Sequence, residues 1–351
     1  MVNQGMGELI AEELAKAGTD PELIAKLKKD RITADKELPP MEFLLKLFDV
    51  PCCPRGELVA FTGKAKSGKT FVMSMMMAAA SAAEALAFRR TTFEPLQVLW
   101  IDTEQSDQST QDILRNRLIP MVCGDGGETF PEHLYDIFNV RTESWQERLP
   151  LLLAAIDMCR PDLVILDGVR DLVDDINNGQ LAHDVTERLM RVAQQARCCI
   201  VCVIHQNKAA EDRTLRGSIG TELTNKAFEV YECEKMMPSR TFVLTQKLTR
   251  KYDITDSLYF TVDDRGLPHQ VGASATTTQS QSKPDASLLF RQVLAGHERL
   301  SGDELRSKVM AMAGMTSFKA YGLLLEKVLK EGIILLQKEK RRIWYSLAGP
   351  E

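Results

Sequence analysis

A phosphate-binding loop is the clearest chemical feature of this sequence. The segment Gly63-Lys-Ala-Lys-Ser-Gly-Lys-Thr70 matches G-x-x-x-x-G-K-[ST] at every fixed position. Its glycines let backbone N–H groups turn towards phosphates, Lys69 would reach the β- and γ-phosphates, and Thr70 would ligate Mg²⁺. The loop follows an apolar run (58–62) and precedes a helical pattern at Phe71–Ala87, whose N-terminus adds its dipole. The nucleotide-binding residues expected are Gly63, Lys64, Ala65, Lys66, Ser67, Gly68, Lys69, Thr70 and Phe71.

Two further apolar runs end in carboxylates. The run DLVILD ends at Asp167, which is expected to organise Mg²⁺ beside Thr70. The run VLWID ends at Asp102 and is followed by Glu104, which could accept a proton from water attacking the γ-phosphate. Plainer alternatives are a helix cap for Asp102 and a solvated loop charge for Glu104. We therefore expect Thr70 and Asp167 as metal ligands and Glu104 as the catalytic base.

A third apolar run, CIVCVI, is followed directly by His205 and Gln206. Either of these polar side chains could contact a γ-phosphate. An isolated histidine is more often structural, and the analogy with phosphate-positioning glutamines favours Gln206 as the sensor. Cys199 and Cys202 have redox or zinc spacing, but residues three apart in a strand face opposite sides. We therefore expect no metal at these cysteines.

These motifs require a sheet that brings several strand ends together. Buried-strand patterns alternate with helical patterns such as Leu181–Ala196, which predicts an α/β domain with a mainly parallel sheet and an antiparallel edge. The expected strands are Glu57–Thr62, Gln97–Asp102, Asp162–Asp167, Cys199–Ile204, Phe228–Cys233, Thr241–Gln246 and Leu258–Val262.

The composition is that of a globular protein, with 351 residues, 44% hydrophobic and 26% charged. Eight scattered cysteines, a polar N-terminal segment and no apolar run of about 20 residues predict a reduced, cytoplasmic protein without a membrane span. The net charge of −5 argues mildly against nucleic-acid binding. It is unevenly divided, because residues 285–351 contain 11 basic and 8 acidic residues and residues 1–284 contain 33 and 41. This asymmetry favours a nucleic-acid-binding appendage at the C-terminal end.

Four segments are expected along the chain. They are a helical arm (1–40) that could contact a neighbouring subunit, an ATPase domain (41–270), a small-residue polar linker (271–285) and a C-terminal domain (286–351). In the last segment, three helical patterns precede a strand, a basic turn and a second strand, an order that resembles a winged helix. The expected DNA-binding residues are Lys319, Tyr321, Lys327, Lys338, Lys340, Arg341 and Arg342. The alternative is a winged helix for protein docking with a solvated basic face.

Five segments in order, GKAKSGKT, WIDTEQ, VILDGVRDL, VIHQNK and RGSIGTELTNK, resemble the RecA/DnaB-like ATPase superfamily over residues 40–265. The resemblance is greatest to RepA-like hexameric helicase ATPases of plasmids and mobile elements. AAA+ proteins usually carry the glutamate directly after the metal-binding aspartate, where this chain has Gly168. The resemblance implies a RecA-like fold and ATP sites between subunits of a ring, each completed by a neighbour's basic residue. The candidates for that residue are Arg216, Lys226, Lys247 and Arg250, and Arg117 is a candidate for orienting Glu104.

The expected function is therefore an oligomeric, hexameric, Mg²⁺-dependent ATPase that acts on DNA in replication, as a helicase or translocase. Single-stranded DNA would pass through the ring, and duplex DNA would bind the winged helix. Two alternatives remain open at this point: a regulatory or loader ATPase that does not unwind DNA, and a filament-forming recombinase that resembles RadA.

Overall fold

The computed structural model describes residues 13–16, 18, 20–124, 129–206, 215, 217–272, 286–312, 318–339 and 342–348, without the side chains of Leu288, Phe318, Lys319, Ala320 and Arg342. Residues 1–42 and 43–351 are separate units. In the first unit, helix α2 (Pro21–Asp30) begins at Asp20, whose carboxylate accepts backbone N–H bonds as an N-cap. None of the α2 residues is buried.

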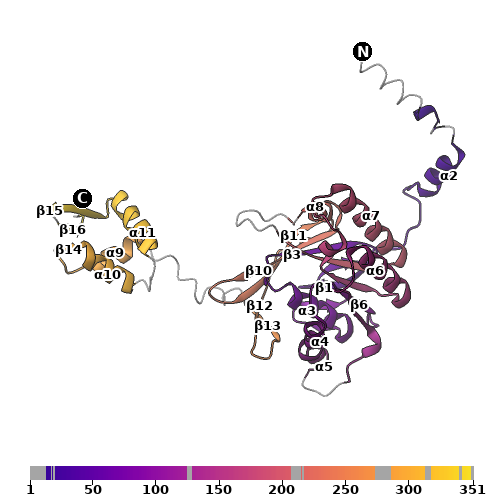
Figure 1. Cartoon of the computed structure of the whole chain (residues 1–351), viewed down its shortest axis with the longest axis horizontal. Helices are drawn as coiled ribbons and strands as arrows, with labels where there is room; N and C mark the ends of the chain where they lie inside the picture. The colour runs from indigo at the N-terminus through magenta and orange to yellow at the C-terminus, as the bar shows by residue number, and fades with distance from the viewer. Residues whose placement is uncertain are drawn as a thin grey trace, which may run out of the picture. The chain divides into compact units, whose positions relative to one another are not determined.

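In the second unit, residues 58–271 contain a large, mostly parallel sheet (Figure 1). Within the described residues its nine strands have the order β13-β12-β11-β10-β3-β9-β8-β6-β7. The strands are β3 (Leu58–Gly63), β6 (Val98–Asp102), β7 (Tyr135–Asn139), β8 (Leu163–Asp167), β9 (Cys199–His205), β10 (Glu229–Met236), β11 (Thr241–Thr249), β12 (Leu258–Val262) and β13 (Pro268–Val271). Strands β10 to β7 pair in parallel, whereas β11, β12 and β13 form an antiparallel edge. The predicted α/β class is confirmed.

Helices cover both faces of this sheet, which is why its strands are apolar at successive positions. One face packs against α3, α4 and α5, and the other against α6, α7 and α8. Their bounds are α3 (Lys69–Ala82), α4 (Asp107–Ile113), α5 (Ile119–Cys123), α6 (Trp145–Cys159), α7 (Gly179–Ala196) and α8 (Gly217–Lys226). Cys199 packs in the first cluster and Cys202 in the second, so the two thiols do face opposite sides of β9.

The helix after the phosphate loop is shorter than the expected Phe71–Ala87. It ends at Ala82, and Ala83 has a positive φ of 75°. Residues that continue the apolar pattern form strands β4 (Glu84–Ala85) and β5 (Phe88–Arg90), which join β1 (Phe43–Leu47) and β2 (Val50–Pro54) in a small sheet. The side chain of Arg90 donates to the carbonyls of Ala80 and Ser81, which satisfies acceptors at the end of α3. A distant strand partner therefore overrides the local helical pattern.

Residues 286–348 have a hydrophobic core of their own, in which Phe290 and Val328 are fully buried. Three helices and, within the described residues, a three-stranded sheet of order β14-β16-β15 surround it (Figure 1). The elements are α9 (Ala286–Leu294), β14 (Leu300–Ser301), α10 (Gly302–Met312), α11 (Phe318–Lys330), β15 (Ile334–Glu339) and β16 (Arg342–Leu347). No helix in the described part of the chain is long and apolar enough to cross a membrane.

Tyr321, expected to face DNA, lies in this core instead. Its side chain is 7% exposed, and its ring stacks on Phe290 with centroids 6.3 Å apart. Burial raises the pKa of its hydroxyl to about 12. The cause is helical spacing, because Tyr321 is one turn from Leu325 and two turns from buried Val328. Lys327 and Lys338 are exposed, whereas Lys340, Arg341 and the side chains of Lys319 and Arg342 lie outside the described residues.

Candidate active site

The phosphate loop has a backbone that only glycine allows at two positions. Gly63 and Gly68 have φ values of +154° and +98°. A Cβ on Gly68 would lie 2.6 Å from the Phe242 ring, and one on Gly63 would lie 2.3 Å from the carbonyl oxygen of Cys233. Strands β10 and β11 therefore pack so closely behind the loop that they determine its shape.

Lys69 points back into this loop. Its Nζ donates to the carbonyl oxygens of Gly63 and Lys64, each at 3.1 Å, and lies 3.1 Å from Nδ1 of His205. Burial lowers the pKa of Lys69, and the nearby Cys233, Glu104 and Asp167 oppose that shift. The ammonium is thus held between the loop and the end of β9.

Asp102 and Asp167 are paired in the parallel register of β6 and β8, but their surroundings differ. Asp102 Oδ1 accepts from the backbone N–H groups of Glu104 and Gln105, and Oδ2 accepts from the Thr110 hydroxyl at 2.7 Å. The structure thus gives Asp102 the role of a cap that shapes the turn before α4.

Asp167 is 4% exposed, and no described residue donates a hydrogen bond to its side-chain oxygens. Burial and the charges of Glu104 and Asp102 raise its pKa to about 8. A divalent cation would stabilise the ionised carboxylate, so this buried acid, with the Thr70 hydroxyl at the start of α3, fits a metal site of oxygen ligands.

Glu104 faces the same site from the end of β6. Its Oε1 lies 3.3 Å from Nε2 of His205, and this hydrogen bond, with the charge of Lys69, lowers the pKa of the carboxyl against the effect of burial. Gly168 makes room for it, because a Cβ there would lie 2.9 Å from Cγ of Glu104 and 2.1 Å from Oγ1 of Thr103. Glycine follows Asp167 because the Thr103–Glu104 turn occupies the space of a side chain.

His205 and Gln206 point in different directions. The register of β9 against β3 pairs His205 with Gly63, which places the imidazole between Lys69 and Glu104. Gln206 is 6% exposed and its amide donates to Glu232, which also forms an ion pair with Lys247 at 2.8 Å. Sequence reasoning favoured Gln206 over His205, because the register that pairs His205 with Gly63 is known only from the structure.

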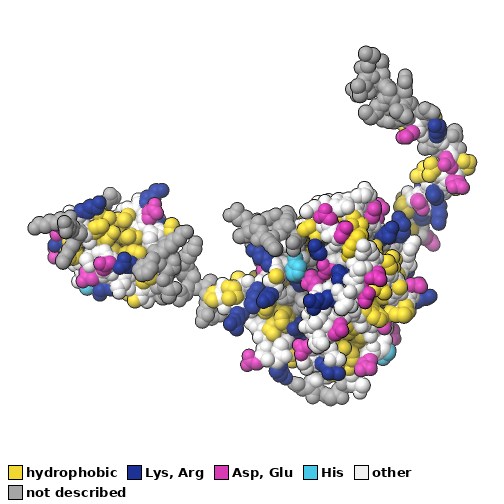
Figure 2. Space-filling view, viewed as in Figure 1, with side chains coloured by type: hydrophobic (Ala, Val, Ile, Leu, Met, Phe, Trp, Pro, Cys, Tyr) yellow, Lys and Arg dark blue, Asp and Glu magenta, His cyan; other side chains and the backbone are white. Residues whose placement is uncertain are grey.

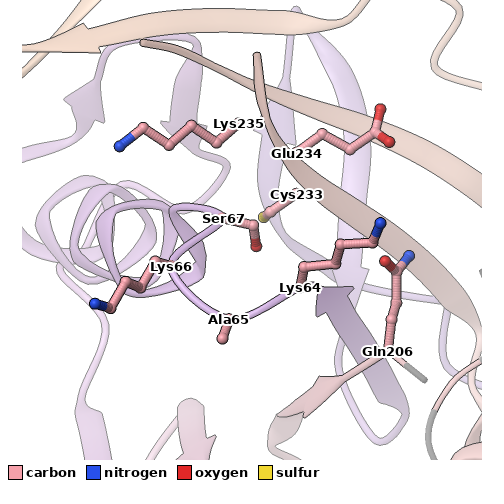
Figure 3. Close-up of a pocket in the computed structure, with 8 residues that line it drawn as sticks. All are labelled: Lys64, Ala65, Lys66, Ser67, Gln206, Cys233, Glu234 and Lys235. Carbon is pink, nitrogen blue, oxygen red and sulfur yellow. The ribbon is translucent and has the colours of Figure 1, made fainter. Parts of the chain in front are cut away.

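A pocket of about 330 Å³ adjoins the loop on the side of Gln206 (Figure 3). Ser67 contributes a buried Oγ that has no hydrogen-bond partner among the described atoms. The pocket is lined by Lys64, Ala65, Lys66, Ser67, Gln206, Cys233, Glu234 and Lys235. Lysine and arginine side chains gather around β10 and β12 on the face drawn in Figure 2. Three lysines and one glutamate line the pocket, so the charge of its lining is net positive.

Two of the remaining basic candidates, Arg250 and Arg117, have partners within their own chain. The guanidinium of Arg250 donates to the carbonyls of Asn225, Lys226 and Ala227 at the C-terminal end of α8. Arg117 lies 3.8 Å above the Phe71 ring, with its Nε 3.4 Å from the carbonyl oxygen of Gly266. Arg117 therefore packs beside α3 instead of orienting Glu104, and burial lowers its pKa to about 10. Arg216 lies outside the described residues.

A family model described as an AAA domain matches residues 22–211 of this chain. The chain belongs to this AAA-domain family. The match covers the phosphate loop, both carboxylate-ending strands and β9, and it confirms the predicted RecA/DnaB-like P-loop ATPase superfamily. Membership implies nucleotide binding with a divalent metal and hydrolysis of ATP. The AAA domain of this chain carries its candidate base two residues after β6, separate from the aspartate that ends β8.

Two solved structures are similar to this chain at a low level. The RadB recombinase matches with a TM-score of 0.44 and 14% identity, covering 63% of this chain and 94% of that chain. The flagellar accessory protein FlaH from Methanocaldococcus jannaschii matches with a TM-score of 0.43 and 12% identity, covering 64% and 92%. No curated protein matches the chain.

Proposed function

We propose that this AAA-domain protein is a Mg²⁺-dependent ATPase whose hydrolytic centre is formed by Lys69, Asp167 and Glu104. The observation that carries the proposal is that His205 lies between Lys69 and Glu104, and that the charges of both act on the buried Asp167. Lys69 and the loop 63–71 would bind the ATP phosphates, Thr70 and Asp167 would hold Mg²⁺, and Glu104 would take the proton of the attacking water.

We also assign the γ-phosphate contact to His205 in place of Gln206. The imidazole lies beside Lys69 and Glu104, whereas the Gln206 amide is bound to Glu232. A residue placed between the lysine and the base can respond to the arrival of a phosphoryl group. Gln206 would then act indirectly, through the strand β10 that carries Glu232.

We propose further that the ATPase is an oligomeric, hexameric RepA-like motor that unwinds or translocates DNA, with each site completed by a neighbour's basic residue. Lys247 and Lys226 are the better candidates for that residue. Arg250 binds three carbonyls of its own chain, whereas Lys247 is 39% exposed and could exchange Glu232 for another anion. The resemblance of the ordered motifs to RepA-like helicases supports this assignment.

The C-terminal residues 286–351 are proposed to be a winged helix that binds duplex DNA, following a linker at 271–285, the ATPase domain at 41–270 and the arm at 1–40. The order of α9, α10, α11 and a hairpin of β15 and β16 supports this proposal. So do the exposed Lys327 and Lys338, on α11 and near the hairpin turn. With Tyr321 in the core, binding would depend on charges towards the DNA backbone.

The first experiment measures steady-state ATP hydrolysis by the full chain and its Glu104→Gln variant, with and without Mg²⁺ and DNA. Loss of turnover with nucleotide binding retained supports the site, and full turnover in the variant excludes Glu104 as the base. Strand displacement on a forked substrate then tests the motor. ATP-dependent binding of duplex DNA without displacement would instead support a loader or regulator, and filaments seen by electron microscopy would support a recombinase.

A further inference from the structure

We propose that Asp171 is a positioning residue for Glu104 and that it acts through Thr103. The turn after β8 would thereby support the hydrolytic site. The inference rests on the proposed function, because it takes Glu104 as the group that activates water.

The contact between Asp171 and Thr103 is a part-buried hydrogen bond between two side chains. Oγ1 of Thr103 lies 2.9 Å from Oδ2 of Asp171, and Thr103 is 2% exposed. The hydroxyl also lies near the carbonyl oxygens of Asp167 (3.0 Å) and Gly168 (3.1 Å). A hydroxyl has one proton, and a carboxylate is a stronger acceptor than a peptide carbonyl. The Asp167 carbonyl already accepts the backbone N–H of Thr103. The Thr103 hydroxyl therefore donates its hydrogen bond to the Asp171 carboxylate.

Asp171 is itself held from several directions. It lies in the short 3₁₀ turn Val169–Leu172, where its backbone N–H donates to the carbonyl of Gly168 at 2.9 Å. Its own carbonyl accepts from Arg148 of α6 at 3.0 Å, and its Oδ1 lies 3.3 Å from Arg170. These contacts hold Asp171, whose carboxylate accepts the Thr103 hydroxyl, in place between β8 and α6.

Glu104 directly follows Thr103, so a shift of Thr103 displaces the candidate base. The space is narrow, because the side chains of Thr103 and Glu104 both pack on the bare α-carbon of Gly168. Displacements of about 1 Å at a reacting group can cost on the order of 100-fold in rate. Losing the contact with Asp171 should thus lower turnover more than nucleotide affinity.

A competing explanation is that Asp171 acts only through its charge, which contributes to the raised pKa of Asp167. Two substitutions separate these roles. Asp171→Asn removes the charge and keeps an oxygen that can accept the Thr103 hydroxyl, whereas Thr103→Val keeps the charge and removes the hydroxyl. Positioning predicts that Thr103→Val is the more damaging change.

The test uses the full chain with ATP and Mg²⁺, and measures kcat, KM and the Kd of a fluorescent ADP analogue. We expect Thr103→Val and Asp171→Ala to lower kcat roughly 10- to 100-fold, with KM and Kd changed less than about threefold. Thr103→Ser should restore most of the rate because it keeps the hydroxyl. Asp174→Ala, which removes an exposed charge from the same segment, is the matched control and should retain the wild-type kcat.

A double-mutant cycle with Glu104→Gln distinguishes positioning from a general structural role. If Asp171 works through Glu104, then Thr103→Val should cause no further loss of the residual rate in the Glu104→Gln background. The same fold loss in both backgrounds, or an unchanged kcat for Thr103→Val alone, would overturn the proposal. If Thr103→Val does not fold, the comparison of Asp171→Asn with Asp171→Ala decides, and equal losses in both would count against positioning. Wild-type turnover in Glu104→Gln alone would refute the base assignment itself, and this outcome is separate from a failure at Asp171.

Discussion

Glu104 is bound to His205 in the structure, with Oε1 of the carboxylate 3.3 Å from Nε2 of the imidazole. The other ring nitrogen of His205, Nδ1, lies 3.1 Å from Nζ of Lys69. A neutral imidazole with its proton on Nε2 satisfies both contacts, because the Lys69 ammonium can only donate. One side chain therefore connects the lysine of the phosphate loop with the proposed base.

The first prediction concerns the pH dependence of hydrolysis in His205→Ala. The hydrogen bond from His205 lowers the pKa of Glu104, so its removal raises that pKa. A base acts in its ionised form, and the acid limb of the kcat/KM profile should therefore move to higher pH in the variant. Gln206→Ala, whose amide contacts Glu232, should leave the limb in place. If the acid limb moved in Gln206→Ala and stayed in place in His205→Ala, then Gln206 and not His205 would be the residue that lowers the pKa of Glu104.

The second prediction concerns Gly168→Ala. An added Cβ would collide with Thr103 and Glu104, so we expect hydrolysis to fall at least about tenfold while nucleotide binding persists. Gly266→Ala is the matched control, because Gly266 has a similarly positive φ of +84° with no atom within 4 Å of the added Cβ. Both variants should lose roughly 1–2 kcal/mol of stability from the left-handed backbone. Equal turnover in the two variants would show that hydrolysis does not depend on the close packing of Thr103 and Glu104 against residue 168.

The third prediction is a fall in stability at neutral pH caused by Glu229. This carboxyl is 0% exposed, its Oε2 accepts from Cys53 N and Tyr231 OH, and burial raises its pKa to about 7, well above the usual value for a glutamate. The folded state thus holds the proton more tightly than the unfolded state. The contribution of Glu229 to the free energy of unfolding is therefore most favourable below pH 4.5. As the pH rises through 7, the protein loses up to about 3 kcal/mol of this free energy.

Denaturant unfolding of Glu229→Gln between pH 5 and 8 checks this prediction. The neutral amide should flatten the dependence and make the variant more stable than the wild type at pH 8, since no charge is then buried. The exposed Glu132→Gln serves as the control and should keep the wild-type slope. Parallel curves for all three proteins would refute a raised pKa at Glu229.

The fourth prediction concerns DNA binding by the C-terminal residues. Replacing exposed Lys327 or Lys338 by alanine in the full chain should weaken duplex binding and reduce the slope of log K against log salt by about 1 each. Lys308→Ala, an exposed lysine on α10, is the control and should leave the slope unchanged if α11 and the hairpin face the duplex. Equal effects of all three changes would indicate a diffuse charge effect without an oriented DNA surface.

The sequence alone identified the features that depend on local pattern. The phosphate loop, the strands that end in Asp102 and Asp167, the strand before His205 and the parallel α/β sheet follow from fixed spacing and apolar runs. Glu104 was found in the same way, because it lies two residues beyond a strand end that the sheet must bring to the loop.

Only the tertiary structure decided which side chains meet. The register of β9 against β3 directs His205 to Lys69 and sends Gln206 to Glu232, a residue on a strand that is remote in sequence. Tyr321 packs in a core and Arg250 binds the end of α8 for the same reason. A periodic pattern shows that a residue has an inner or outer face, whereas the neighbour it meets depends on contacts between distant segments.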